Sequence, residues 1–200
     1  NLNLIKKNNI KKFVKLSKKK FETIDVLINC AGLQHVSPIC KFSDKIWEYI
    51  IDINLNTPFK MIKEVLPIMR KSKWGRIINI SSVHGTVASK FKAGYVSSKH
   101  GLVGLTKVVA LETAKENITC NAIGPGFVNT ELVRKQIVNI SKQKKISFKK
   151  AKNGMLKEKH PSMGFVEKDD ISSLAYYLTT KEASQITGSN MIIDGGWTVQ

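Results

Sequence analysis

Short apolar runs that alternate with helical patterns constrain the fold of this chain more than any other feature of its sequence. Each run is too short for a stable helix and is followed by residues that favour turns, such as Gly, Pro and Ser. Strands that alternate with helices pair in parallel, because a crossover helix returns the chain to the same end of the sheet. The sequence therefore predicts one α/β domain over residues 1–200, with a mostly parallel sheet. The predicted strands are residues 24–28, 76–80, 118–123 and 191–193.

Helical patterns fill most of the remaining chain. Ser43 is a suitable N-cap for a helix that begins at Asp44, and Pro58 interrupts the helical pattern that follows. Residues 131–160 are polar, Lys-rich and poorly periodic, as expected of a mobile flap. Residues 5–20 mix apolar side chains with lysines at helical spacing, which favours an amphipathic surface helix over a membrane-surface helix. Further helices are predicted over residues 61–69, 92–115 and 169–178.

The formal net charge of +18 suggests a nucleic acid or an anionic membrane as a partner. However, thirty of the 33 basic residues are Lys, whereas Arg is the residue that reads phosphates and guanines through paired hydrogen bonds. The lysines are also spread along the chain. We therefore interpret the charge as a solvated surface and expect neither a nucleic-acid nor a membrane partner.

The cysteines and the hydropathy indicate where such a chain resides. The three cysteines form no Cys-x-x-Cys pair and no disulfide framework of the secreted type, which favours reduced thiols and a cytoplasmic location. No apolar run reaches the roughly 18 residues that a membrane-spanning helix needs. The chain also does not open with a signal-peptide pattern.

Tyr95 and Lys99 are four residues apart on the predicted helix 92–115, so their side chains rise from the same face. A free Tyr has a pKa near 10 and is a poor base at neutral pH. A neighbouring ammonium favours the phenolate, so Lys99 is expected to bring the pKa of Tyr95 toward the working range. An amphipathic helix can also contain this spacing by chance, so the pair needs support from other residues.

That support comes from residues that follow the predicted strands. Ser82 lies at the carboxyl end of the strand 76–80, the edge at which open α/β sheets bind ligands. The run 29–32 (NCAG) and Pro125-Gly126 end two other strands at the same edge. Asn54 is a poor helix former inside a predicted helix, where its backbone could be free to hold a water. We therefore expect a ligand site at this edge.

In this order, these motifs resemble those of the short-chain dehydrogenase/reductase family from about Asp25 to the end of the chain. The resemblance implies a Rossmann-like, doubly wound parallel sheet and a hydride-transferring oxidoreductase that uses NAD, without a metal. It makes Tyr95 the general acid/base, with Lys99 lowering its pKa and binding the nicotinamide ribose. Ser82 would polarise the substrate carbonyl, and Asn54 would anchor a proton-relay water. The implied cofactor-binding residues are Asn29, Ala31, Gly32, Tyr95, Lys99, Pro125, Gly126, Val128 and Thr130.

Within the family, the resemblance is greatest to enzymes that interconvert D-3-hydroxybutyrate and acetoacetate in ketone body metabolism. It is carried by residues 33–36 (LQHV), 82–85 (SVHG), 118–123 (ITCNAI) and 194–200 (DGGWTVQ). A small carboxylate would suit an ammonium combined with neutral donors, because charge-assisted hydrogen bonds are strong. The implied substrate-binding residues are Gln34, His84, Lys92, Gln136 and Trp197, with Trp197 closing the apolar side.

Two departures leave alternatives open. Met163-Gly164 stands where relatives often have a basic residue, and the segment 131–160 is unusually Lys-rich. The Gly-rich turn TGxxxGxG, which cradles a pyrophosphate on a helix N-terminus, is not in the sequence. We therefore expect an N-terminally incomplete domain of a protein that is a homotetramer when complete. The alternatives are a 3-oxoacyl-carrier-protein reductase, another member of the family, or a non-catalytic remnant that partners a complete subunit.

Overall fold

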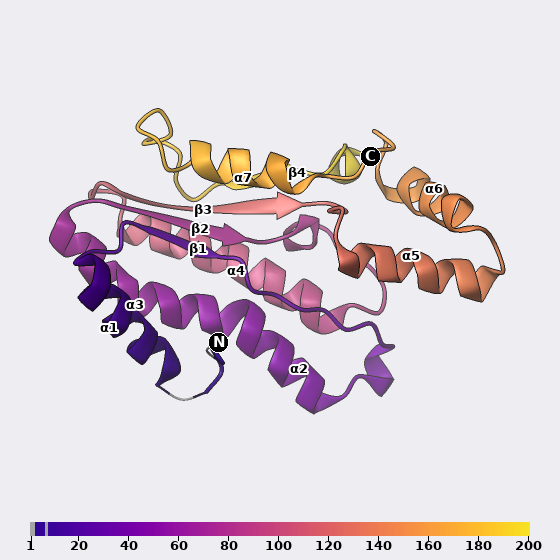
Figure 1. The fold of residues 1–200 in the computed structure, drawn as a ribbon, viewed down its shortest axis with the longest axis horizontal. Coiled ribbons are helices and arrows are strands. Elements are labelled where there is room, and N and C mark those ends of the chain that lie inside the picture. The colour runs from indigo at the N-terminus through magenta and orange to yellow at the C-terminus, as the bar shows by residue number, and fades with distance from the viewer. Residues whose placement is uncertain (1–2, 7) are drawn as a thin grey trace.

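Four parallel strands form the sheet in the computed structural model, which describes residues 3–6 and 8–200 (Figure 1). Their spatial order is β1-β2-β3-β4, so every neighbouring pair is joined by a crossover, as the alternating sequence pattern predicts. The registers pair Val26 with Arg76, Gly75 with Ile118, and Ala122 with Asn190. The strands are β1 (Val26–Asn29), β2 (Gly75–Ile80), β3 (Ile118–Pro125) and β4 (Asn190–Ile193).

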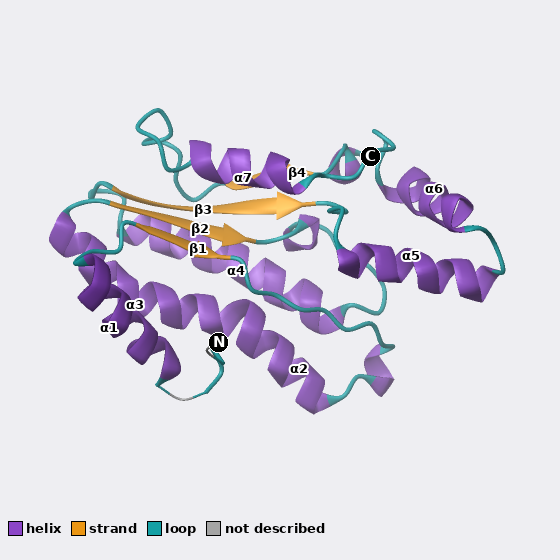
Figure 2. Cartoon of the chain, in the orientation of Figure 1, coloured by secondary structure: helices purple, strands orange, loops and turns teal. Residues whose placement is uncertain are grey.

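Helices cover the two faces of the sheet unequally (Figure 2). Helices α3 (Thr57–Ser72) and α4 (Ala93–Glu112) pack on one face, where Val65, Met69 and Ile77 belong to the largest buried cluster. Helix α7 (Lys168–Tyr177) packs on the other face, above Ile78 and Ile123. Because β2 and β3 are covered on both faces, nearly every residue in them is buried, which explains their continuous apolar sequence.

Strand β1 is the edge of the described sheet and has one open face. Leu27 and Asn29 are buried, whereas Val26 and Ile28 on the opposite face are exposed. Helix α1 (Asn9–Phe21) packs nearby on α3 through Ile10 and Val14. The predicted amphipathic helix is therefore confirmed, although residue 7 of the predicted segment lies outside the described residues. None of the helices among residues 3–6 and 8–200 combines the length and apolar character needed to cross a bilayer.

The helix that begins at Asp44 continues past Pro58 instead of being interrupted there. Helix α2 (Asp44–Ile51) leads into a π-helical turn, η2 (Asp52–Asn56), which leads directly into α3. Pro58 lies in the first turn of α3, where its fixed φ angle suits a helix. Pro58 has no N–H, so the carbonyl four residues earlier, that of Asn54, loses its usual helical donor. The interruption of the helical pattern at Pro58 therefore marks a π turn within a continuous helical segment.

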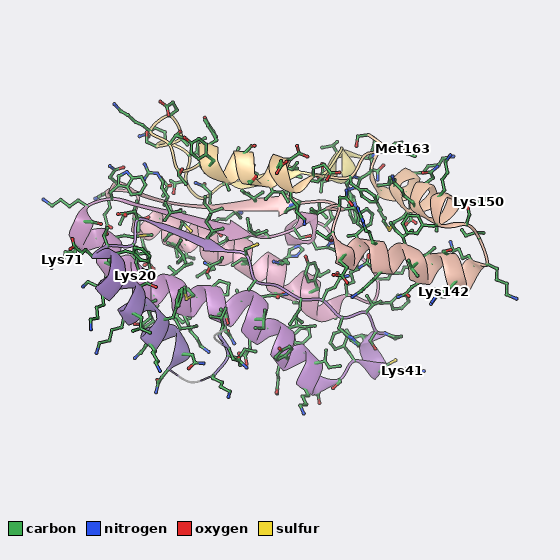
Figure 3. The ribbon with its side chains drawn as sticks, in the orientation of Figure 1. Lys20, Lys41, Lys71, Lys142, Lys150 and Met163 are labelled. Carbon is green, nitrogen blue, oxygen red and sulfur yellow. The ribbon has the colours of Figure 1, made fainter. Side chains whose placement is uncertain are left out.

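Residues 131–160 are mostly helical, whereas the sequence predicted a poorly periodic segment. They form α5 (Glu131–Lys144) and α6 (Phe148–Lys159), which pack against each other and which we call the α5–α6 hairpin. Ser147 caps α6 by accepting the N–H of Lys150. A small core of Val133, Ile137 and Ala151 lies inside, while lysines such as Lys142 and Lys150 project outward (Figure 3). The many lysines hid the apolar spacing of this core.

The remaining helical turns are short. They are η1 (Ile39–Lys41), η3 (Val83–Gly85) and η4 (Trp197–Val199). Two of them, η3 and η4, directly follow the ends of β2 and of β4. They bring side chains from these strand ends toward the cavity described next.

Candidate active site

A cavity of about 770 Å³ lies at the carboxyl ends of the strands, where the sequence predicted a ligand site. It is formed by the ends of β1, β2 and β3, by α4, α5 and α7, and by the C-terminal turn η4. Most of the predicted site residues line this cavity together. They are Gly32, Gln34, Ser82, His84, Lys92, Tyr95, Lys99, Pro125, Gly126, Val128, Thr130, Gln136 and Trp197.

A second hollow of about 810 Å³ lies near the opposite ends of the strands and holds none of the predicted site residues. Its main cation, Arg76, is buried and donates to the carbonyl oxygens of Gly75 and Asn117 at 2.8 and 3.1 Å. The guanidinium also lies 4.5 Å from the centroid of the Trp74 ring. Nη1 of Arg76 is therefore bonded to the backbone, whereas its buried Nε has no hydrogen-bond partner among the described residues. We place the chemistry in the first cavity because the predicted site residues line that cavity.

Ser82 and Tyr95 form the centre of the cavity. Ser82 follows β2, and its hydroxyl lies close enough to Tyr95, which rises from α4, to influence the pKa of the phenol. The Ser82 hydroxyl also lies 3.4 Å from Nδ1 of His84. Burial raises the pKa of Tyr95, and the nearby Ser82 hydroxyl offsets this only in part. A substrate oxygen placed between the two hydroxyls would therefore meet a protonated Tyr95.

Lys99 is buried one turn below Tyr95 and does not touch the phenol oxygen. Its Nζ donates to the carbonyl oxygen of Ile80 at 2.7 Å and lies 5.6 Å from the centroid of the Tyr95 ring. Burial lowers the pKa of Lys99 to about 8, against a smaller raising effect from Cys30. The expected lowering of the Tyr95 pKa by Lys99 is therefore not found. The reason is that Lys99 is itself desolvated and binds a backbone carbonyl.

Asn54 is fully buried outside the cavity lining and holds the loop after β1. Its side chain accepts the Leu33 N–H at 3.0 Å and donates to the Leu33 carbonyl at 2.9 Å. It also donates to the Ser98 hydroxyl on α4. The side chain is thus committed to structure, while its backbone carbonyl is freed by Pro58. This arrangement leaves the predicted water-anchoring role to the backbone.

Gln34, His84, Lys92 and Gln136, the residues predicted to bind a carboxylate, all line the cavity. His84 is buried and lies 2.8 Å from the Ser89 hydroxyl through Nε2. Burial, with smaller effects from Lys92, His100 and Lys159, lowers the pKa of His84 to about 4, so the ring is neutral at pH 7. Burial also lowers the pKa of Lys92. These residues therefore offer the partly desolvated amino group of Lys92 among neutral hydrogen-bonding groups.

An aromatic cluster that includes Trp197 and Phe127 lines the cavity next to His84. The buried Trp197 ring lies 5.4 Å from that of His84 and 4.8 Å from that of Phe127, measured between ring centroids. Phe127 in turn stacks on the buried His160 at 5.3 Å. The sequence analysis missed Phe127 and His160. Phe127 directly follows the Pro125-Gly126 motif and could have been found, whereas a single His before Pro161 carries no such signal.

The two remaining predicted residues, Asn29 and Ala31, do not line the cavity. Asn29 turns into the sheet and donates to the side chain of Asn79 at 2.8 Å, and Asn79 donates to Thr106. Ala31 is exposed on the loop after β1. Cys30 and Gly32, the alternate residues of this run, face the cavity instead. Among the residues described, no three His, Cys, Asp or Glu side chains come together as metal ligands.

Comparison with known proteins identifies the family of the chain. A family model described as enoyl-(acyl carrier protein) reductase matches residues 1–198. The D-beta-hydroxybutyrate dehydrogenase of Rhizobium meliloti (strain 1021) is 45% identical over 181 residues, which cover 90% of this chain and 70% of the relative. The 3-oxoacyl-(acyl-carrier-protein) reductase FabG of Staphylococcus epidermidis (strain RP62A) is 31% identical over 194 residues, covering 97% of this chain and 75% of the relative. The chain belongs to the short-chain dehydrogenase/reductase family, whose members are oxidoreductases.

Solved structures show the same fold. A 4-hydroxyisoleucine dehydrogenase in complex with NADH superposes with a TM-score of 0.84 at 35% sequence identity. It covers 100% of this chain, which corresponds to 80% of that structure. A mutant of 4-hydroxyisoleucine dehydrogenase, in complex with NADH and succinate, gives a TM-score of 0.88 at 37% identity, with 100% and 78% coverage. The Rossmann-like parallel sheet expected from the motifs is therefore confirmed.

Proposed function

We propose that this protein interconverts D-3-hydroxybutyrate and acetoacetate, with NAD as the hydride acceptor and donor. The observation that carries the proposal is that Lys92, His84, Gln34 and Gln136 meet in the cavity that holds Ser82 and Tyr95. The first group suits a small carboxylate, and the second suits a hydroxyl or carbonyl oxygen. Both ends of a four-carbon 3-hydroxy acid thus have partners, and Trp197 covers its apolar part.

The residues divide the work as follows. In the reduction direction, the protonated Tyr95 donates its proton to the substrate carbonyl oxygen while a hydride reaches the carbon of the same carbonyl. Oxidation is the reverse: a Tyr95 phenolate accepts the proton of the substrate hydroxyl while the hydrogen on the same carbon leaves as hydride. Ser82 holds the oxygen throughout and donates a hydrogen bond to it as it becomes a carbonyl. Lys99 holds the Tyr95 side of the cavity through its bond to Ile80 and offers its remaining N–H groups to a ribose. Bound NAD would supply the carbon that accepts the hydride.

The cavity fits the nicotinamide half of such a cofactor. Pro125, Gly126, Val128 and Thr130 line it together with Lys99. The related 4-hydroxyisoleucine dehydrogenase structures contain NADH. Since the phosphate-binding TGxxxGxG turn is not among these 200 residues, the activity is proposed for the product of the intact gene.

Steady-state rates decide between this proposal and its main alternative, a 3-oxoacyl-carrier-protein reductase, which the 31% identical FabG supports. The protein from the intact gene is assayed on D-3-hydroxybutyrate with NAD and on an acetoacetyl thioester with NADH and NADPH. We expect a higher kcat/KM for the free acid, because a thioester has no carboxylate for Lys92. Preference for the thioester would support the alternative. Absence of both activities would support the third candidate, a non-catalytic partner of a complete subunit.

We also propose that the protein assembles as a homotetramer. Apolar side chains are exposed on two helices that pack on the sheet, including Phe59 on α3 and Val108 and Leu111 on α4. Exposed apolar side chains of this size are typical of subunit interfaces. Light scattering coupled to gel filtration tests the proposal, and a monomer at micromolar concentration would refute it.

A further inference from the structure

His160 joins three parts of the molecule that are far apart in the sequence. It follows the last turn of α6 and is completely buried. Its Nε2 accepts the backbone N–H of Phe127 at 2.8 Å, just past the end of β3. Its Nδ1 lies 2.9 Å from the carbonyl oxygen of Gly164. Both ring nitrogens are therefore used.

These two bonds define one tautomer of the ring. An N–H donor from Phe127 requires a lone pair on Nε2, and a carbonyl acceptor at Gly164 requires a proton on Nδ1. The ring is therefore neutral and protonated on Nδ1. Its single proton and its single lone pair are both committed to backbone groups.

The surroundings are shaped to the ring. A Cβ added at Gly126 would overlap it, and one at Gly195 would lie 3.0 Å from Nδ1, so both positions need glycine here. The ring stacks on Phe127 with an interplanar angle of 20° and lies 5.8 Å from the centroid of Trp197. Phe127 and Trp197 both line the cavity, and Trp197 also contacts the ring of His84.

We propose that His160 is a positioning residue that fixes Phe127 and Trp197 and thereby sets the size of the apolar side of the substrate pocket. It does so as a latch between the α5–α6 hairpin and the sheet, because it is attached to α6 and bonded to the residue after β3. The consequence for substrate size depends on the proposed function, whereas the latch itself does not.

Protonation would break this latch. A proton on Nε2 removes the acceptor for Phe127 and places two N–H groups against each other. The charged groups around the ring are Asp194, whose carboxylate favours the protonated form, and the neighbouring Lys159, whose Nζ lies 5.9 Å from the centroid of the Trp197 ring. Burial lowers the pKa of His160, against smaller raising effects from the Gly164 carbonyl and Asp194, so the neutral ring is favoured and the contact loosens only as the pH falls into the acid range.

The latch is tested without any assay of activity. Nitrogen-15 spectra of the histidine rings in the protein from the intact gene should show one ring protonated on Nδ1, and this signal should be missing from His160→Gln and His160→Ala. In a Trp47→Phe/Trp74→Phe background, Trp197 is the remaining tryptophan of this chain. Iodide should quench its fluorescence several-fold more in His160→Ala than in His160→Gln. A ring protonated on Nε2, or equal quenching in the two variants, would overturn the proposal.

Kinetics test the consequence for the substrate. Gln can accept the Phe127 N–H and donate to Gly164, so His160→Gln should retain a KM within about threefold of the wild type. His160→Ala loses a buried hydrogen bond and should raise KM for D-3-hydroxybutyrate about tenfold, with a smaller change in kcat. It should also gain relative activity on longer 3-hydroxy acids. The exposed His100→Ala on α4 is the matched control.

The two kinds of readout separate the possible failures. If no variant turns over hydroxybutyrate but the ring and Trp197 signals behave as expected, the proposed function fails and the latch stands. If the enzyme is active but His160→Ala and His160→Gln change KM and kcat alike, the positioning role is refuted. If His160→Ala does not fold, the His160→Gln spectrum and rates still decide the question.

Discussion

Two walls of the cavity, which we call the sheet wall and the hairpin wall, are supported by hydrophobic cores of very different size. Ser82, Tyr95 and Lys99 stand on β2 and α4, in the middle of a sheet that is covered on both faces. Gln136 stands on α5, in a hairpin whose own core is a small cluster around Ile137. Lysines such as Lys142 and Lys150 project outward from the hairpin (Figure 3). One wall is therefore part of the main fold, and the other is a small unit attached to it.

This difference indicates how the two walls can serve one site. Groups that transfer a proton must be held within a few tenths of an ångström, which a doubly covered sheet provides. A small unit with few buried contacts opens more easily than the global fold, as a substrate gate requires. The His160 latch lies where the two walls meet. The predictions below test this division, beginning with the wall on the sheet.

The largest effect is expected at Tyr95. Tyr95→Phe removes the proton donor and acceptor but keeps the ring, so turnover should fall roughly 10²–10⁴-fold while cofactor affinity changes little. Stopped-assay rates and fluorescence titration with NADH would measure the two quantities. Tyr49→Phe, at an exposed position of α2, is the control. A Tyr95→Phe enzyme within about tenfold of the wild type would reject the role.

The next effect concerns pH and His84, which belongs to the sheet wall. Its pKa is lowered from 6.5 to about 4, mainly by burial, with positive charges at Lys92, His100 and Lys159 adding to the effect. The unfolded chain therefore takes up a proton at a higher pH than the folded one. The contribution of the neutral His84 to the free energy of unfolding is fully present above pH 6.5 and is lost as the pH falls from 6.5 to about 4. The loss is on the order of 3 kcal/mol.

Denaturant melts at several pH values check this expectation. His84→Gln should flatten the fall in the free energy of unfolding between pH 6.5 and 4, whereas His100→Gln, which removes only a minor contribution to the His84 pKa, should flatten it much less. Carboxylates that titrate in the same range contribute equally to both variants, so the difference between them isolates His84. Parallel pH profiles for the two variants would show that His84 is not buried as a neutral ring.

A smaller effect is expected at Lys92, which faces the substrate carboxylate in the proposed function. Lys92→Ala removes one charge-assisted hydrogen bond and should raise KM for D-3-hydroxybutyrate about tenfold, with little change for a neutral ketone. Lys90→Ala, an exposed lysine two residues earlier, should leave KM unchanged. Equal effects on the acid and on the neutral ketone would remove Lys92 from the carboxylate pocket.

The same division between walls explains what could be predicted from the sequence. The strands, α4 and the Ser82–Tyr95–Lys99 set followed from apolar runs and short-range spacing, because these residues are fixed by local structure at the sheet edge. The α5–α6 hairpin was missed because its apolar positions are diluted by lysines. The contacts of His160 and the bond between Lys99 and Ile80 join segments that are distant in the sequence, so short-range spacing does not reveal them. Burial of Tyr95, which also depends on the fold, raises its pKa where the sequence predicted a lowered one.

The smallest effect tests whether the hairpin opens by itself. Gly154 lies inside α6 at an exposed position, with nothing within 4 Å of an added Cβ, so Gly154→Ala should stabilise α6 by roughly 0.5–1 kcal/mol. Gly104 offers the same free space in α4 on the sheet wall, which makes Gly104→Ala the matched variant. If the hairpin opens independently, Gly154→Ala should slow amide exchange in α5 and α6 without raising the melting temperature, whereas Gly104→Ala should raise it. Equal rises in melting temperature would mean that both walls unfold as one unit, and the hairpin could not then act as a separate gate.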